Sequence, residues 1–120
     1  MIFEQIVEKA PEGTVIPKPK AKLDFRVKGI GKRRGEEAII YFVPNHKNLA
    51  CPNEKGINRT EFEKAYEQLS MTGQFTREWF KTNLPDCNNE GSCNFTTIGG
   101  LFDLIGKAKY TGPGKYSRVE

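Results

Sequence analysis

The sequence predicts an α+β fold in which an N-terminal β-hairpin is followed by a three-helix unit that ends in a basic β-hairpin. Three patterns lead to this prediction. Apolar and charged residues alternate over residues 23–28, which is the period of a half-buried strand. Apolar residues recur at helical spacing over residues 60–72 and 95–105. Finally, turn-forming residues at 111–114 separate two short segments that carry lysine and tyrosine, as in a hairpin.

The chain has 120 residues, which fits one domain. We divide it into an N-terminal arm and linker (residues 1–22), a β-hairpin (23–44) and a helical unit with the basic hairpin (59–119). No apolar run approaches the roughly 18 residues that cross a bilayer. Charged residues also interrupt the apolar residues near the N-terminus, unlike those of a signal peptide. These features predict a soluble, cytoplasmic protein without a membrane partner.

The first 22 residues contain two different patterns. Residues 2–9 place apolar side chains at rough helical spacing and form either a short helix or an added strand. The prolines at 17 and 19 fix their own φ angles, so residues 17–22 are expected to be extended. Lysines at 18, 20 and 22 make this segment either a flexible arm or, more simply, a solvated linker.

The N-terminal hairpin is predicted to have a cationic tip. Residues 23–28 and 37–43 form its strands, and a glycine-rich turn between them carries Lys32, Arg33 and Arg34. This turn is not a phosphate-binding loop, because it lacks a Gly-Lys-Ser/Thr sequence that opens a helix. The next residues, 45–58, are expected to form a polar loop.

Capping signals place the first two helices of the helical unit. Thr60 and Glu63 have the spacing of a capping box, and Gly73 is the expected C-cap. Thr76 should cap a second helix over residues 77–84, which Pro85 ends.

The last helix of the unit is predicted to lead directly into the basic hairpin. Residues 86–92 are expected to form a polar loop, because they are turn-forming residue types. A third helix covers residues 95–105, and Gly106 ends it. The basic hairpin then follows and is expected to pair with the N-terminal hairpin. The predicted core consists of Phe25, Ile40, Phe42, Phe62, Tyr66, Leu69, Trp79, Phe80, Ile98, Leu101, Phe102 and Ile105.

Charge is distributed unevenly along the chain. Residues 1–35 hold nine Lys/Arg and four acids, residues 36–94 hold six and nine, and residues 95–120 hold four and two. The two ends are therefore basic and the middle is acidic. This asymmetry indicates either a polyanionic partner or an uneven solvated surface.

From residue 59 the order of predicted elements is helix, short extended link at 73–76, helix, loop, helix and basic hairpin. Residues 59–119 thus resemble the winged helix-turn-helix domain, with residues 95–105 as the recognition helix and residues 106–118 as the wing. The resemblance implies DNA binding. The whole chain also resembles the small orphan proteins of bacterial integron and other mobile gene cassettes, a class without a common activity.

The leading hypothesis is therefore a DNA-binding protein without catalytic activity. Lysine and arginine would contact phosphates, and tyrosine would stack or hydrogen-bond. The candidate nucleic-acid contacts are Lys32, Arg33, Arg34, Thr96, Thr97, Lys107, Lys109, Tyr110, Lys115, Tyr116 and Arg118.

Three alternatives to these contacts remain open. The hairpin lysines could instead protect a sheet edge from aggregation. The helix at 95–105 either docks on DNA through its threonines or packs internally, and Gly99 and Gly100 allow a close backbone approach. A protein-interaction or oligomerisation module, such as a homodimer, would use a sheet edge or that glycine face.

Catalytic and metal-binding patterns are weak. An enzyme is the least favoured reading, since the single histidine, His46, has no obvious catalytic partner. Three cysteines are an odd number, which favours reduced thiols over a disulfide framework. His46, Cys51, Cys87 and Cys93 have the composition of a structural zinc site, but their spacing is wider than usual. No cofactor is expected.

Overall fold

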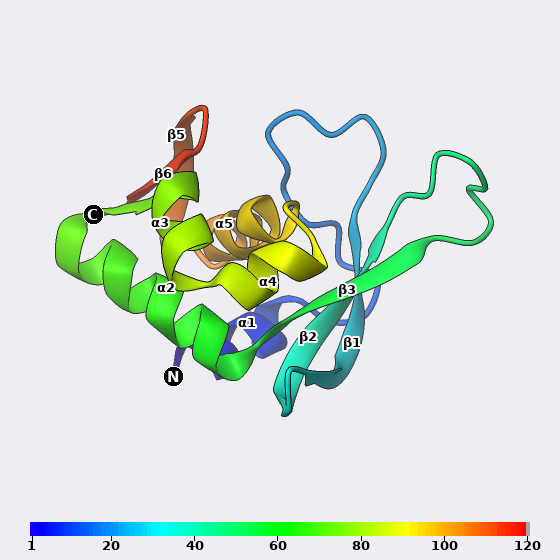
Figure 1. The fold of residues 1–120 in the computed structure, drawn as a ribbon, viewed down its shortest axis with the longest axis horizontal. Coiled ribbons are helices and arrows are strands. Elements are labelled where there is room, and N and C mark those ends of the chain that lie inside the picture. The colour runs from blue at the N-terminus through cyan, green and yellow to red at the C-terminus, as the bar shows by residue number, and fades with distance from the viewer. Residues whose placement is uncertain (120) are drawn as a thin grey trace.

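The computed structural model describes residues 1–119 and has an α+β architecture with two small antiparallel sheets (Figure 1). The helices are α1 (Ile2–Lys9), α2 (Arg59–Thr72), α3 (Arg77–Asn83), α4 (Pro85–Glu90) and α5 (Asn94–Leu104). The strands are β1 (Arg26–Arg33), β2 (Glu36–Val43), β3 (Asn53–Asn58), β4 (Gln74–Thr76), β5 (Ala108–Gly112) and β6 (Lys115–Arg118). Residues 2–9 are thus a helix rather than a strand.

The first sheet has the order β1-β2-β3 and contains the predicted N-terminal hairpin. The predicted bounds of its first strand, residues 23–28, are wrong, because β1 covers Arg26–Arg33 and includes Gly29 and Gly31, which were expected in the turn. Arg34 and Gly35 form the two-residue turn of the hairpin with φ angles of 53° and 81°, the left-handed conformation that type I′ turns require. The prediction of a loop over residues 45–58 is wrong at its end, because β3 pairs with β2 there. Only Ile57 among its six residues is a large apolar side chain, so β3 lacked the period of a strand.

The cap of α2 lies two residues earlier than predicted. Asn58 Oδ1 accepts a hydrogen bond from Glu61 N at 2.9 Å, and Glu61 Oε1 accepts one from Asn58 N at 2.8 Å. The capping box is therefore Asn58–Glu61, and the prediction of Thr60–Glu63 is wrong. Thr60 instead donates its hydroxyl hydrogen to Glu36 at 2.6 Å, which ties the helix to β2. Gly73 is the C-cap, as predicted, with φ 83°.

The segment between α2 and α5 is more helical than predicted. Thr76 caps α3 as expected, since its Oγ1 accepts a hydrogen bond from Trp79 N at 3.1 Å. Pro85, however, begins α4 instead of ending the helical region, so the predicted loop at 86–92 is mostly helix. Proline is well tolerated at the first helical position, where its missing N–H has no intrahelical partner.

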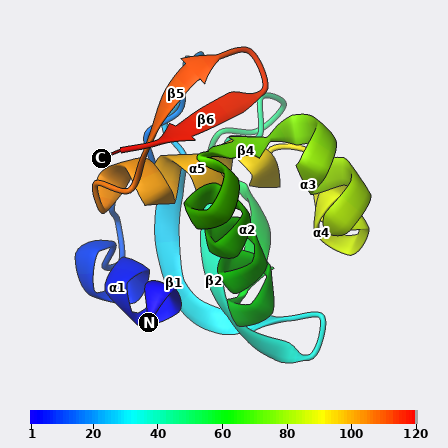
Figure 2. The same ribbon diagram turned by 90° about the vertical axis from the view of Figure 1, so that its left-hand side faces the viewer.

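The second sheet has the order β4-β6-β5 and contains the predicted C-terminal hairpin. The expectation that this hairpin pairs with the N-terminal one is wrong, because β6 pairs with β4 through Phe75 and Tyr116. Both rings are buried, with 6.5 Å between their centroids. Figure 2 shows β4, β5 and β6 grouped over α5 and apart from the first sheet.

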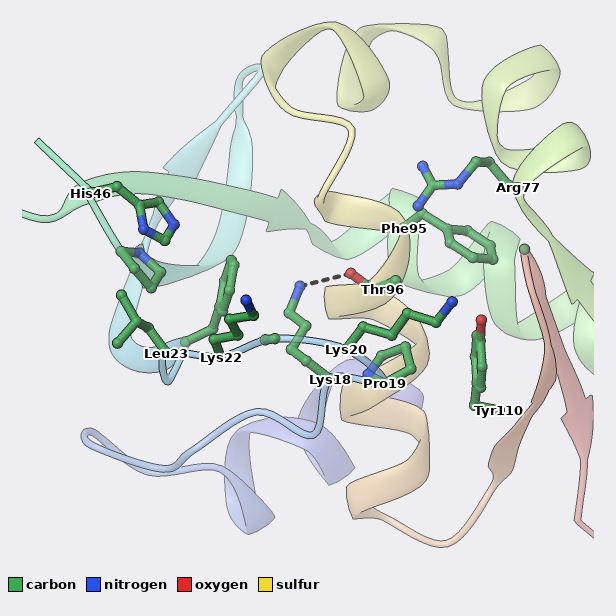
Figure 3. A pocket seen from close by; sticks show the side chains of 14 residues that line it. Lys18, Pro19, Lys20, Lys22, Leu23, His46, Arg77, Phe95, Thr96 and Tyr110 are labelled. Atoms are coloured by element: carbon green, nitrogen blue, oxygen red, sulfur yellow. Dashed lines mark hydrogen bonds between the residues drawn. The ribbon is translucent and has the colours of Figure 1, made fainter.

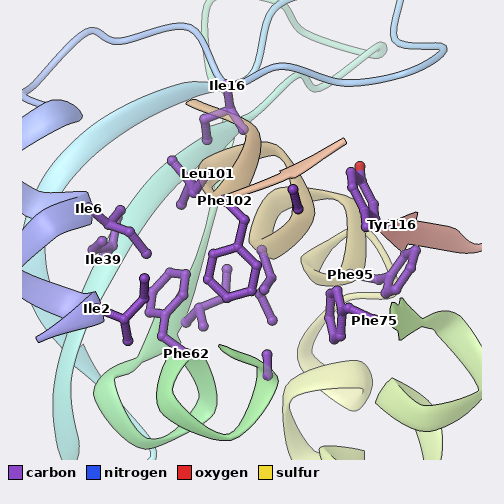
Figure 4. Close-up of a cluster of buried hydrophobic side chains, with 14 of the residues drawn as sticks. Ile2, Ile6, Ile16, Ile39, Phe62, Phe75, Phe95, Leu101, Phe102 and Tyr116 are labelled. Carbon is purple, nitrogen blue, oxygen red and sulfur yellow. The ribbon is translucent and has the colours of Figure 1, made fainter. Parts of the chain in front are cut away.

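Helix α5 lies at the centre of the core (Figure 4), where eight of its residues are buried. Of the predicted core, seven residues are buried: Ile40, Phe62, Leu69, Phe80, Ile98, Leu101 and Phe102. Phe25, Tyr66, Trp79 and Ile105 pack against the core and are partly buried, whereas Phe42 is only partly buried on the sheet. Buried residues that the prediction omitted include Ile2, Phe3, Ile6, Ile16, Tyr41, Ile57, Phe75, Phe95 and Tyr116.

Within residues 1–119, no helix has both the length and the apolar character needed to cross a membrane.

Candidate functional site

Ion pairs neutralise the cationic tip of the N-terminal hairpin. Arg34 Nε lies 2.6 Å from Glu61 Oε2 and its Nη1 lies 2.7 Å from Glu90 Oε1, while Arg33 Nε lies 2.9 Å from Glu90 Oε2. Burial acts to raise the pKa of Glu90, but hydrogen bonds from Arg34 and Arg33 outweigh it and lower the pKa. Arg33 and Arg34 therefore hold the hairpin against α2 and α4 rather than face a partner. Lys32 is exposed beside them.

Arg34→Met is expected to lower the free energy of unfolding by about 2–4 kcal/mol, because it leaves the side chain of Glu61 buried without its countercharge. That side chain is only 8% exposed. Urea unfolding at neutral pH measures the effect. Lys28→Met is the matched control on the same hairpin, since its pair with Glu54 is exposed and should contribute about 0–1 kcal/mol. Equal losses in the two variants would show that the Arg34 pairs carry no special stability.

The glycine face of the predicted recognition helix is covered by other parts of the chain, whereas Thr96 at its start is partly exposed. Thr97 is fully buried in α5, and Tyr116, which was expected to contact nucleic acid, is 1% exposed. A Cβ built on Gly99 would lie 2.2 Å from the ring of Tyr116, and one on Gly100 would lie 2.2 Å from the carbonyl oxygen of Pro17. The glycine pair therefore serves internal packing, and neither DNA nor a second subunit has access to that face.

The C-terminal hairpin presents a mixture of paired and exposed cations. Lys109 Nζ lies 2.7 Å from Asp103 Oδ1, although its side chain remains 66% exposed. Arg118 donates a hydrogen bond to the carbonyl oxygen of Ser70. Lys107 and Lys115 are partly exposed. The charges of this hairpin that remain accessible to a partner are therefore those of its lysines.

A pocket of about 510 Å³ lies between the C-terminal hairpin, the start of α3, the start of α5 and residues 18–23 (Figure 3). Four cationic side chains line it: Lys18, Lys20, Lys22 and Arg77. Three aromatic rings also line it, those of Phe25, Phe95 and Tyr110, and His46 lies at its edge. None of its lining residues, all in the described part of the chain, is Asp or Glu. A pocket with this lining is suited to an anion that carries an apolar or aromatic group.

Lys18 is partly buried and packs against α5, so the prediction of a solvated linker is wrong for this residue. Its Nζ donates hydrogen bonds to Cys93 O at 3.1 Å, Thr96 Oγ1 at 2.9 Å and Thr97 Oγ1 at 2.7 Å. It also lies 4.2 Å from the centroid of the Phe25 ring. Burial lowers the pKa of Lys18 to about 7, with Arg77 adding to the effect and Cys93 opposing it.

Arg77 joins α3, α5 and the hairpin turn at the pocket rim. Its guanidinium carbon lies 4.7 Å from the centroid of Phe95, and its Nη1 donates to Ser92 O at 3.0 Å. Its backbone N–H donates to Gly114 O at 2.9 Å, which ties the helix start to the turn between β5 and β6. These contacts connect the three elements that meet at this side of the pocket.

The residues considered for zinc do not come together. Cys51 is exposed and Cys87 is buried, while His46 lies at the pocket. Within residues 1–119, no group of three or more His, Cys, Asp or Glu side chains is arranged to hold a metal ion.

Sequence patterns predicted the hairpin but not most of the residues that line the pocket. Lys18, Lys20, Lys22, Arg77 and Phe95 were not among the candidate contacts. A usable signal was present, because residues 17–22 carry three lysines and no acid. Comparison of this chain with protein families, with curated proteins and with solved structures gives no match.

Proposed function

We propose that this protein binds nucleic acid without catalysing a reaction. The contact face combines residues 18–22, the start of α3 and the C-terminal hairpin. The observation that carries the proposal is the pocket beside that hairpin, whose lining contains four cations, three aromatic rings and no carboxylate. Phosphates favour such a surface, and aromatic rings add contacts to sugars or bases.

The winged helix-turn-helix resemblance supports this proposal in part. The order helix, short strand, helix and final hairpin is present, and β4 pairs with β6 of the hairpin. In our proposal the hairpin acts as the wing. The buried helix α5 takes no part in base reading, so the contacts come from Lys20, Lys22 and Lys115 and are directed at phosphates.

Labelled mixed-sequence DNA is expected to bind this face with a strong dependence on salt. If these three lysines meet phosphates, log K should fall with log salt at a slope of roughly −2.7, which is measurable between about 50 and 200 mM salt. The combined variant Lys20→Ala, Lys22→Ala and Lys115→Ala should lose most of the affinity. Fluorescence anisotropy measures both effects.

The matched control removes three exposed lysines that lie outside the proposed contact face, through Lys9→Ala, Lys64→Ala and Lys81→Ala. It has the same net charge as the Lys20/Lys22/Lys115 variant and should retain most of the affinity. An equal loss in the two variants would mean that total charge, rather than this face, drives binding. No binding by the native protein at low salt would remove the proposal.

A protein-interaction function is the second candidate, favoured by the outer edge of the first sheet. Residues 13–16 cover the start of edge strand β1, where Gly13 N donates to Val27 O at 2.8 Å. Farther along this strand, Ile30 is 52% exposed. A second chain could add a strand there. Mass measurement at increasing protein concentration distinguishes this function, because a dimer would form without nucleic acid.

A further inference from the structure

We propose that the pocket receives an unpaired nucleobase, so that the protein prefers single-stranded to double-stranded nucleic acid. This inference rests on the nucleic-acid binding proposed above and adds to it the class of substrate. It follows from the positions of the aromatic rings and cations around the pocket.

The pocket offers planar groups for stacking. Tyr110 is half-buried, packs edge-on against Tyr116 with 5.5 Å between ring centroids, and borders the pocket. Arg77 lies over the ring of Phe95, with its guanidinium carbon 4.7 Å from the ring centroid. Figure 3 shows Tyr110, Phe95 and Arg77 at one end of the pocket. Bases stack on tyrosine rings and on guanidinium planes in many single-strand sites.

The cations lie where the backbone of a bound strand would pass. Lys20 and Lys22 are exposed residues of the segment that forms one wall. Figure 3 shows Lys20 extending toward Tyr110, while Lys22 lies on the other side of Lys18. A base inserted beside Tyr110 would leave its two flanking phosphates near this wall. No carboxylate lines the pocket to repel them.

A base in a duplex cannot enter this pocket without leaving its stack. Extrusion of a paired base costs a few kcal/mol, whereas an unpaired strand has little stacking to lose. The pocket volume of about 510 Å³ falls within the range of small-molecule sites, so it has room for one base. Duplex DNA would therefore be limited to phosphate contacts on the rim, and single strands would gain stacking in addition.

The test compares labelled single strands, dT and U oligomers of about 12 nucleotides, with a duplex of the same length at about 50 mM salt. We expect at least one single strand to bind about tenfold more tightly than the duplex. Equal or tighter binding of the duplex would overturn this inference while leaving nucleic-acid binding in place. Failure of all three probes to bind would overturn both.

An abasic strand of the same length separates stacking from charge. It carries the same phosphates as the dT strand but no bases, and it should bind no more tightly than the duplex. Equal affinity for the abasic and dT strands would show that no base enters the pocket. This comparison uses only the native protein, so misfolding of a variant cannot affect it.

Substitution of Tyr110 locates the base. Tyr110→Ala should weaken dT binding by roughly 5- to 150-fold, the range that base–aromatic stacking covers, and should change duplex binding by less than about twofold. Tyr110→Phe keeps the ring and should bind like the native protein. If Tyr110→Ala binds dT with native affinity, the base does not stack on this ring and the proposed position is wrong.

Discussion

Replacement of Lys18 by methionine is expected to abolish a rise in stability that the native protein shows between its folded-state pKa of about 7 and the ordinary value of 10.5. Burial lowers the pKa of this amine, so within that window the unfolded chain holds a proton that the folded chain lacks. The native free energy of unfolding should therefore rise by up to about 1.4 kcal/mol per pH unit. Below pH 7 both states are protonated, and the folded chain bears the full cost of the buried charge.

The quantity to measure is the difference in free energy of unfolding between the native protein and Lys18→Met, from urea unfolding at a series of pH values. Because other titrating groups contribute to both proteins, the difference isolates Lys18. Between the folded-state pKa and the ordinary pKa of Lys18, this difference should increase in favour of the native protein by on the order of 4 kcal/mol. Lys20→Met removes an exposed lysine of the same segment and is the control. Parallel curves for the native protein and Lys18→Met would contradict the buried amine.

Gly100→Ala is expected to destabilise the protein by about 3 kcal/mol, at the upper end of what overpacking usually costs. The new Cβ would lie 2.2 Å from the carbonyl oxygen of Pro17 and 2.9 Å from Cγ2 of Ile16. A backbone oxygen cannot rotate away, so the segment that carries Lys18 would have to separate from α5. On a solvent-exposed helix face, a glycine-to-alanine substitution would stabilise the protein by about 1 kcal/mol, because alanine is the better helix former.

The sign of the change in stability caused by Gly100→Ala therefore tests whether residues 16–17 pack on α5. Thermal or urea unfolding of the variant is sufficient to determine it. Gly112→Ala is the control, since no heavy atom lies within 4 Å of the Cβ position there. A stabilised Gly100→Ala variant would mean that this face of α5 is open, and the alternative of a partner on the glycine face would return.

The secondary structure was largely predictable because its signals are local. Gly73 and Thr76 were correctly assigned as caps, since each capping interaction lies within a few residues of the chain. Both hairpins were found from their turns. The errors occurred where local signals were weak or ambiguous: Pro85 is compatible with the start as well as the end of a helix, and β3 has a single large apolar residue.

The candidate site was less predictable. Of the expected contacts, Tyr110 and Thr96 line the pocket, while Arg33 and Arg34 form ion pairs and Thr97 and Tyr116 are buried. Exposure and pairing of a side chain depend on which distant residues fold against it. Sequence patterning reports the face of one element but not the element that covers it.

By itself, the sequence determined the α+β class, most of the helices, both hairpins and the excess of positive charge at the two ends of the chain. Periodicity, capping and turn chemistry decide these features over a few residues. The tertiary structure alone decided which cations are available. Lys18 meets Thr97 across 79 positions and Arg34 meets Glu90 across 56. Such contacts form only when the core brings distant segments together. The packing of α5 against residues 16–18 decides the burial of Lys18, and the packing of α4 against the hairpin tip decides the pairing of Arg34.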